Sequence, residues 1–119
     1  RKLSLVIDLD QTILHATRDP IVDRWLDDPE HPNHTVAQRD LHRIILNGGQ
    51  PYFIRLRPGL QAFLEWARGC FELHIYTMGS REYARACTAL FDPTGELFYD
   101  RIMSRDDSGS THMHLIMLV

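Results

Sequence analysis

The sequence predicts an α/β protein with a Rossmann-like parallel sheet, crossover helices and a small β-hairpin inserted after the first strand. Two apolar runs, residues 3–9 and 71–77, have the composition of buried strands. A helical apolar pattern precedes the second run and another follows it. Strands that alternate with helices predict parallel pairing through crossover connections, and 119 residues suffice for one domain with a core.

The segment between the first strand and the first helix carries the predicted insertion. Residues 15–40 are polar and irregular, which predicts a long loop with at most one short helix near residues 22–26. The apolar runs 41–46 and 52–56 flank Asn47-Gly48-Gly49, a sequence typical of a hairpin turn. We therefore expect a two-stranded hairpin there.

Both helices are predicted from apolar residues at helical spacing. The first helix should open at Pro58-Gly59, with Pro58 in its first turn, and stop at Gly69. Its apolar positions are Leu60, Phe63, Leu64 and Ala67. The second should begin after Ser80 as N-cap and stop before Pro93. Its apolar positions are Tyr83, Ala86, Cys87 and Leu90. A short third strand is expected at residues 101–104.

Composition excludes several classes of function. Hydrophobic residues make up 44% and charged residues 24%, as in ordinary soluble globular proteins. No apolar run is long enough to span a bilayer, so we expect no membrane partner. The net charge of -3 predicts no direct binding to nucleic acid. The two cysteines lack metal-type spacing and indicate a reducing compartment.

The most informative residues are Asp8 and Asp10, which directly follow a run of strand-forming apolar residues. A carboxylate at the end of a buried strand is costly unless it is paired or binds a metal. In an extended chain, residues two apart point to the same side, so the pair predicts a site for a hard cation such as Mg²⁺. The alternative interpretation is a turn with an Asx-type cap.

Thr77 ends the second long strand, and the carboxyl ends of parallel strands form the ligand-binding edge of such sheets. Asp8 is placed to attack phosphorus, and Asp10 to act as general acid and base. Mg²⁺ would be held by Asp8 and the backbone carbonyl of Asp10. The remaining candidates, for binding phosphoryl oxygens, are Thr77, the amides of Met78 and Gly79, and Arg57. Thr77 could instead be a helix cap, and Arg57 a surface residue.

The stretch Asp8-Leu9-Asp10-Gln11-Thr12 resembles the DxDxT motif of the haloacid-dehalogenase superfamily of phosphotransferases. Within that superfamily the chain is similar to the phosphatases of the carboxy-terminal repeat domain of RNA polymerase II, especially the TFIIF-associated type. The further segments that carry this resemblance are 5–17, 56–60, 76–84 and 101–110. They follow one another in the order found in that family.

The resemblance implies the roles of individual residues. Asp8 would be the nucleophile and a magnesium ligand, and Asp10 the acid/base and second ligand. Thr12, Arg57 and the segment Thr77-Met78-Gly79 would bind the phosphoryl group. The substrate would be phosphoserine in the polymerase repeats, TFIIF a partner, and the location nuclear. Residues 1–119 would form a partial catalytic domain, with the insertion at about 18–56.

The chain also departs from the family it resembles. Such enzymes carry a third-motif lysine and then paired aspartates, but this chain has no lysine after Lys2 and no aspartate after Asp107. Residues 112–119 do not resemble the family, so we expect an altered or truncated end and poor activity. Two alternatives stay open: a phosphopeptide-binding module without turnover, and a small-molecule phosphatase of the same superfamily.

Overall fold

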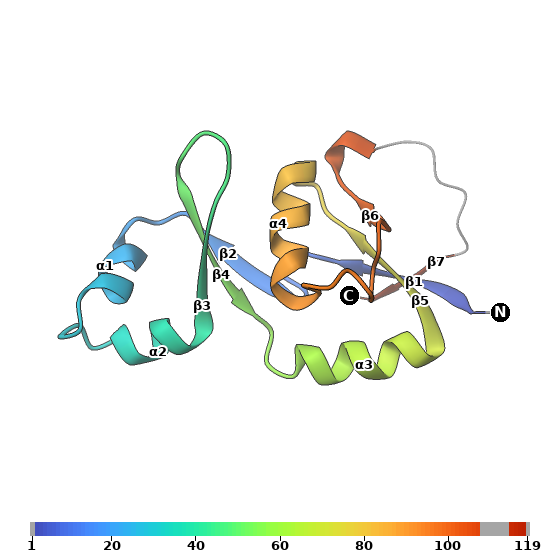
Figure 1. Ribbon diagram of the computed structural model, residues 1–119, viewed down its shortest axis with the longest axis horizontal. Coiled ribbons are helices and arrows are strands. Elements are labelled where there is room, and N and C mark those ends of the chain that lie inside the picture. The colour runs from blue at the N-terminus through green and yellow to red at the C-terminus, as the bar shows by residue number, and fades with distance from the viewer. Residues whose placement is uncertain (1, 108–114, 119) are drawn as a thin grey trace.

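The computed structural model describes residues 2–107 and 115–118 and arranges them around two sheets. A parallel sheet has the strand order β6-β5-β1-β7, and an antiparallel sheet has the order β2-β4-β3. The molecule is elongated, with extents of 52 × 31 × 24 Å, and the parallel sheet lies toward one end (Figure 1). The antiparallel sheet lies between it and the two insertion helices, which form the other end (Figure 1). The predicted fold class, a parallel sheet with crossover helices and a small antiparallel insertion, is confirmed.

The central strand of the parallel sheet is β1 (Leu3–Asp8), which pairs with β5 (Phe71–Tyr76) and β7 (Leu115–Leu118). β6 (Ile102–Met103) pairs with β5 and is shorter than the predicted strand. For residues 112–119 the sequence predicted no element, yet the backbone of β7 lies beside β1. The rest of that stretch, residues 112–114 and 119, is outside the described residues.

Two helices join the parallel strands and share the sheet's core. They are α3 (Leu60–Cys70) and α4 (Arg81–Phe91). Leu64 and Cys87 from these helices are fully buried in one cluster with Ile7 and Ile75 from the strands. None of the helices in the described part of the chain is long and apolar enough to cross a membrane.

Two details of α3 differ from the prediction. Gly59, at φ 79°, is the N-cap, so Pro58 lies before the helix instead of in its first turn. The helix also runs through Gly69, and its last turn closes when the amide of Phe71 bonds to the carbonyl of Ala67. Ala67 is fully buried, so packing outweighs the modest cost of one glycine within a helix. For α4 the predicted cap is confirmed, because the Ser80 hydroxyl accepts the Tyr83 amide at 3.1 Å.

The insertion contains more regular structure than the sequence predicted. The hairpin of β3 (Leu41–Ile45) and β4 (Pro51–Leu56) and the short helix α1 (Ile21–Asp27) are confirmed. The prediction of an irregular segment is wrong at β2 (Leu14–Thr17), which pairs with β4, and at α2 (His34–Asp40).

These two elements depend on tertiary contacts. β2 is too short to produce a clear alternating pattern, and its pairing partner, β4, lies far along the chain beyond both insertion helices. α2 buries only Ala37, so its sequence has no apolar stripe to reveal it. The ring nitrogen Nδ1 of His34 bonds to the carbonyl of Trp25 at 2.8 Å, and α2 therefore packs beside α1.

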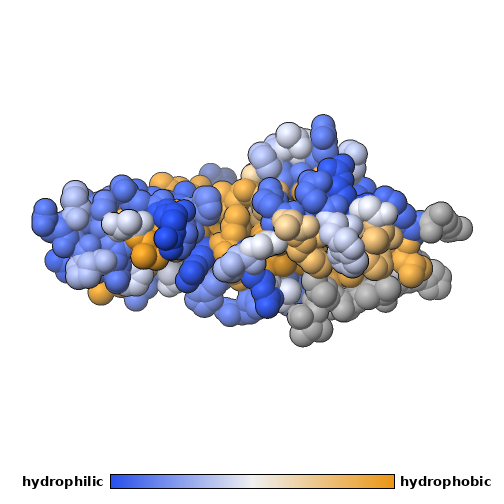
Figure 2. All heavy atoms as spheres, turned by 90° about the horizontal axis from the view of Figure 1, so that it is seen from below, coloured by the Kyte–Doolittle hydropathy of each residue, from blue (hydrophilic) through white to orange (hydrophobic). Residues whose placement is uncertain are grey.

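The two faces of the antiparallel sheet meet different surroundings. The register pairs Leu14 with Leu56 and Ala16 with Ile54 on the face that joins the main core. His15 pairs with Arg55 and Thr17 with Phe53, and these side chains face α1 and α2. The insertion end is mainly hydrophilic in the view of Figure 2, whereas apolar residues gather near the centre of the molecule and at the end that holds the parallel sheet.

The buried carboxylate of Asp92 ties the end of α4 to the chain that leads into β6. Its oxygens accept the amides of Leu97 at 3.2 and 3.3 Å and of Phe98 at 3.0 Å. A carboxylate at a helix C-terminus opposes the helix dipole, so these bonds must compensate for it. We expect Asp92→Ala to lower the free energy of unfolding by about 3 kcal/mol, because two buried amides lose their acceptor.

Urea denaturation followed by circular dichroism measures this change. The exposed Asp100→Ala variant is the control and should stay within about 0.5 kcal/mol of the unchanged protein. A loss of less than about 1 kcal/mol in Asp92→Ala would contradict the assigned role of this carboxylate.

Candidate active site

A tight turn follows β1 immediately, and this turn determines where Asp10 lies. The amide of Leu9 still bonds to the carbonyl of Tyr76 at 2.9 Å, continuing the pairing with β5. Gln11 then adopts φ 65°, and its amide bonds to the carbonyl of Leu14 at 2.9 Å. A left-handed non-glycine residue costs roughly 1–2 kcal/mol, and such residues concentrate at functional sites. Because β1 ends at Asp8, the alternation expected for an extended strand does not set the direction of Asp10.

Asp10 is the centre of a hydrogen-bond network. The hydroxyl of Thr77 donates to its Oδ2 at 2.7 Å, and the hydroxyl of Tyr83 donates to its Oδ1 at 2.6 Å. The carboxylate is half-buried. One of its oxygens receives a short, charge-assisted bond from the residue that follows β5, and the other receives one from α4. The sequence predicted that Asp8 and Thr77 face one another at this edge, whereas the hydrogen bond that the structure shows joins Thr77 to Asp10.

Thr77, Met78 and Gly79 form the turn between β5 and α4. The sequence predicted that the Thr77 hydroxyl and the amides of Met78 and Gly79 bind phosphoryl oxygens, but in the structure the Thr77 hydroxyl and the Gly79 amide bond to other protein groups. Thr77 is fully buried, and its hydroxyl also accepts the Gly79 amide at 3.0 Å. That amide therefore supports Thr77 in this structure and does not point freely toward an anion. The side chain of Met78 is 66% exposed, and its Sδ accepts the Tyr76 hydroxyl at 2.9 Å.

Arg57, Thr12 and Asp8 form a second group at the same edge. The Nη1 of Arg57 donates to the carbonyl of Thr12 at 2.9 Å, and the Arg57 amide donates to the carbonyl of Ile13 at 2.8 Å. The Thr12 hydroxyl approaches Oδ2 of Asp8 at 3.5 Å, a long contact. A guanidinium has five N–H donors, so exposed Arg57 keeps others for a ligand.

Burial controls the protonation of two groups beside Asp10. Burial, and then the bond to Asp10, raise the pKa of the Tyr83 hydroxyl well above its usual range, so the phenol stays a protonated donor. Burial also raises the pKa of the Cys87 thiol to about 12. Cys87 is therefore a neutral thiol, and it adds no charge to this network.

The segment after β6 fixes the start of α4. In the 3-10 helix Arg105–Asp107, the Asp106 carboxylate accepts the Arg81 amide at 3.0 Å. The Arg81 guanidinium lies 2.8 Å from Asp107 and lowers the pKa of that carboxyl. The Arg105 amide bonds to the carbonyl of Gly79 at 3.0 Å. Asp106 and Asp107 thus anchor Arg81 at the start of α4, and Arg105 anchors the Met78-Gly79 turn.

A cation at the end of β1 would have two protein oxygens as ligands, one from Asp8 and the backbone carbonyl of Asp10. Within residues 2–107 and 115–118, no group of three or more His, Cys, Asp or Glu side chains converges. Asp8 and the backbone carbonyl of Asp10 supply two hard oxygen donors at the end of β1. Mg²⁺ accepts such a partial set, since it commonly keeps several waters and binds one or two protein oxygens together with phosphate. The residues present therefore fit magnesium.

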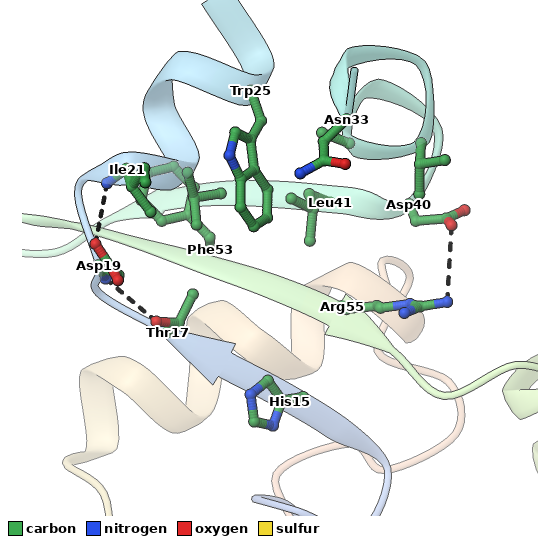
Figure 3. Close-up of a pocket in the computed structure, with 13 residues that line it drawn as sticks. His15, Thr17, Asp19, Ile21, Trp25, Asn33, Asp40, Leu41, Phe53 and Arg55 are labelled. Carbon is green, nitrogen blue, oxygen red and sulfur yellow. Dashed lines mark hydrogen bonds and ion pairs between the residues drawn. The ribbon is translucent and has the colours of Figure 1, made fainter. Parts of the chain in front are cut away.

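A cavity of about 580 Å³ lies between the insertion helices and the outer face of the antiparallel sheet. Trp25 from α1 and Phe53 from β4 point into it, and an ion pair between Asp40 and Arg55 borders it (Figure 3). A neighbouring hollow shares His15 and Arg55 with this cavity and also reaches Thr12 and Arg57. A continuous surface therefore leads from the insertion to the edge that holds Asp8.

Sequence reasoning missed Tyr83 and Gln11 as site residues. Tyr83 was counted only as an apolar member of the α4 stripe. A buried tyrosine usually finds a partner for its hydroxyl, and this was the available signal. For Gln11 the sequence offers no signal, because glutamine is not a residue that favours positive φ.

Comparison with known proteins finds relatives along nearly the whole chain. The family model for "NLI interacting factor-like phosphatase" matches residues 3–116. A phosphatase of the RNA polymerase II C-terminal domain from Schizosaccharomyces pombe is 50% identical over 115 residues, covering 92% of this chain and 16% of the relative. The Homo sapiens phosphatase of the same description is 37% identical over 108 residues, covering 90% of this chain and 10% of the relative.

The fold comparison agrees with the sequence comparison. The solved structure of the fission yeast RNA polymerase II CTD phosphatase Fcp1-R271A bound to beryllium fluoride has a TM-score of 0.83 at 48% identity, covering 92% of this chain and 31% of that one. The chain thus spans less than a third of the proteins it matches. With a family model matched over residues 3–116 and relatives of this identity, the chain belongs to the NLI interacting factor-like phosphatase family.

Proposed function

We propose that the chain is part of the catalytic domain of a magnesium-dependent protein serine/threonine phosphatase that forms an aspartyl-phosphate, and that its substrate is the phosphorylated C-terminal domain of RNA polymerase II. The observation that carries this proposal is the pair of short bonds that orient Asp10 two residues after Asp8. The names of its relatives support the substrate.

In the proposed first step, a carboxylate oxygen of Asp8 attacks phosphorus and the bond from phosphorus to the serine oxygen breaks. Asp10 in its protonated form gives its proton to that serine oxygen. In the second step a water attacks the phosphorus of the aspartyl-phosphate, Asp10 takes a proton from the water, and Asp8 is released as carboxylate. The free donors of Arg57 bind phosphoryl oxygens throughout.

Asp8 and the carbonyl of Asp10 would hold Mg²⁺, which would offset the repulsion between the carboxylate and the phosphate. Thr12 and the Thr77-Met78-Gly79 turn shape the same edge. In this proposal Thr77 acts chiefly through Asp10, since its hydroxyl is already committed to that carboxylate.

The insertion cavity favours a polypeptide over a sugar phosphate as substrate. A phosphoserine at Asp8 would leave its flanking residues on the surface that runs past His15 and Arg55 to the cavity. A small sugar phosphate would reach none of the aromatic lining. Association with TFIIF and a nuclear location remain predictions from the family resemblance.

Phosphopeptide binding without turnover is the second candidate. It is favoured by donors at the site that are already engaged, since the Gly79 amide bonds to Thr77 and one N–H of Arg57 bonds to the carbonyl of Thr12. Fewer donors are then left to stabilise the charge that develops on the phosphoryl group. Asp8→Asn separates the two functions. For the phosphatase we expect Mg²⁺-dependent hydrolysis of para-nitrophenyl phosphate to fall at least about a thousandfold, because the nucleophile is lost.

The assay distinguishes three outcomes. Loss of turnover in Asp8→Asn, with the melting temperature retained, supports the aspartyl-phosphate mechanism. Equal activity in both proteins would contradict it. A folded wild-type protein that binds a phosphoserine peptide but hydrolyses neither substrate would favour the binding module.

The substrate class is tested at the cavity with Trp25→Ala. We expect this variant to raise the KM for a phosphoserine peptide about tenfold, through loss of an aromatic contact, and to leave para-nitrophenyl phosphate hydrolysis within about twofold. Steady-state kinetics on both substrates measure the effect. Trp66→Ala is the matched control, because Trp66 is 61% exposed on α3 and does not line the cavity. An unchanged peptide KM in Trp25→Ala would argue against a peptide path over the insertion.

A further inference from the structure

The hydroxyl of Tyr83 makes the shortest side-chain hydrogen bond to Asp10, yet none of the roles assigned above falls to it. We propose that Tyr83 is a positioning residue that holds the Asp10 carboxyl in the orientation needed to protonate a serine leaving group. The inference rests on the proposed function, because it assumes that Asp10 is the general acid.

The geometry leaves Asp10 able to react while it is held. Tyr83 occupies one acceptor site on Oδ1 at 2.6 Å, and Thr77 occupies one on Oδ2 at 2.7 Å. A carboxylate offers about four acceptor sites, so each oxygen keeps one for a proton or a substrate. Two donors from different elements fix the plane of the group, and removal of either would free its rotation.

Tyr83 is itself held rigidly. It is only 7% exposed, and its amide is bonded to the Ser80 cap. Its ring fits against the backbone of Gly79, where an added Cβ would come within 2.7 Å of the ring carbon Cδ2. A side chain at position 79 would therefore displace the ring. The glycine in the turn is explained by the room that Tyr83 needs, since the φ of Gly79 is not among the positive ones.

The ring also links Asp10 to the insertion. The rings of Tyr52 and Tyr83 lie 5.2 Å apart at 53°, a favourable tilted pair. Tyr52 belongs to β4, and the guanidinium of Arg18 lies 4.9 Å above its ring. The Asn47 amide of the hairpin also bonds to Glu82, beside Tyr83, at 3.2 Å. The insertion sheet thus packs against the side chain that orients the acid.

The test uses the dependence of rate on the leaving group. Serine leaves as a strongly basic alkoxide and needs a proton, whereas para-nitrophenolate is a weak base and needs little help. We expect Tyr83→Phe to lower kcat for a phosphoserine peptide about 10- to 100-fold, a share of what a general acid supplies, and kcat for para-nitrophenyl phosphate less than about threefold. KM should change little for either substrate.

Two further variants serve as references: Asp10→Asn lacks the acid itself, and Tyr99→Phe is the control for loss of a tyrosine hydroxyl. Asp10→Asn gives the full leaving-group dependence of a missing acid, and Tyr83→Phe should show a weaker form of it. Tyr99→Phe removes a tyrosine hydroxyl at a side chain that is 62% exposed, and should behave as wild type. If Tyr83→Phe fails to fold, Tyr83→Met replaces it. Methionine also lacks the hydroxyl and can fill the buried space, so the same preferential loss with serine is expected.

The outcomes separate the two proposals. Active wild-type protein with equal losses on both substrates in Tyr83→Phe would mean that Tyr83 is merely structural, and would overturn the inference alone. An unchanged Tyr83→Phe protein would do the same. Wild-type protein without turnover on either substrate would overturn the proposed function and the inference together.

Discussion

The arrangement of the site depends on how one half-buried carboxylate, that of Asp10, is satisfied. An ionised carboxyl away from water is strongly unfavourable unless donors surround it. Thr77 at the end of β5 and Tyr83 on α4 supply those donors, so Asp10 links the turn after β1 to β5 and α4. The fold brings these residues together because parallel strands place their carboxyl ends at one edge. The elements that form the core therefore also orient the polar groups at its rim.

Both faces of the antiparallel sheet in the insertion contribute to the region around Asp10: one packs against the core and Tyr83, and the other lines the cavity. On one face Leu14 and Ile54 extend the main core, and Tyr52 packs on Tyr83. On the other face Phe53 lines the cavity beneath α1 and α2. Alternation along a strand puts neighbouring residues on opposite faces, so one short sheet both supports the edge that holds Asp10 and forms the surface that leads away from it. An element outside the parallel sheet thus contacts Tyr83, one of the two residues that bond to Asp10.

The geometry of the Met78-Gly79 turn depends on the missing side chain of Gly79 and on the hydrogen bonds of its backbone amide and carbonyl. Gly79 leaves space for the Tyr83 ring and donates its amide to Thr77, and its carbonyl accepts the Arg105 amide. Arg81, at the start of α4, is held by Asp106 and Asp107 from the segment after β6. The turn is thus fixed from three directions, which favours a pre-arranged site over one that forms only when the ligand binds.

The sequence by itself determined the elements whose signals are local. The strand before Asp8, the hairpin at Asn47-Gly48-Gly49, both crossover helices and the aspartate motif follow from periodicity, turn chemistry and residue type. Only the tertiary structure decided that β2 and α2 form, since their stability comes from a distant strand and a neighbouring helix. It also decided that Asp10 is bonded by Thr77 and Tyr83. Hydrogen bonds between residues so far apart in the sequence depend on the tight turn at Gln11 and on packing, and neither leaves a periodic trace in the sequence.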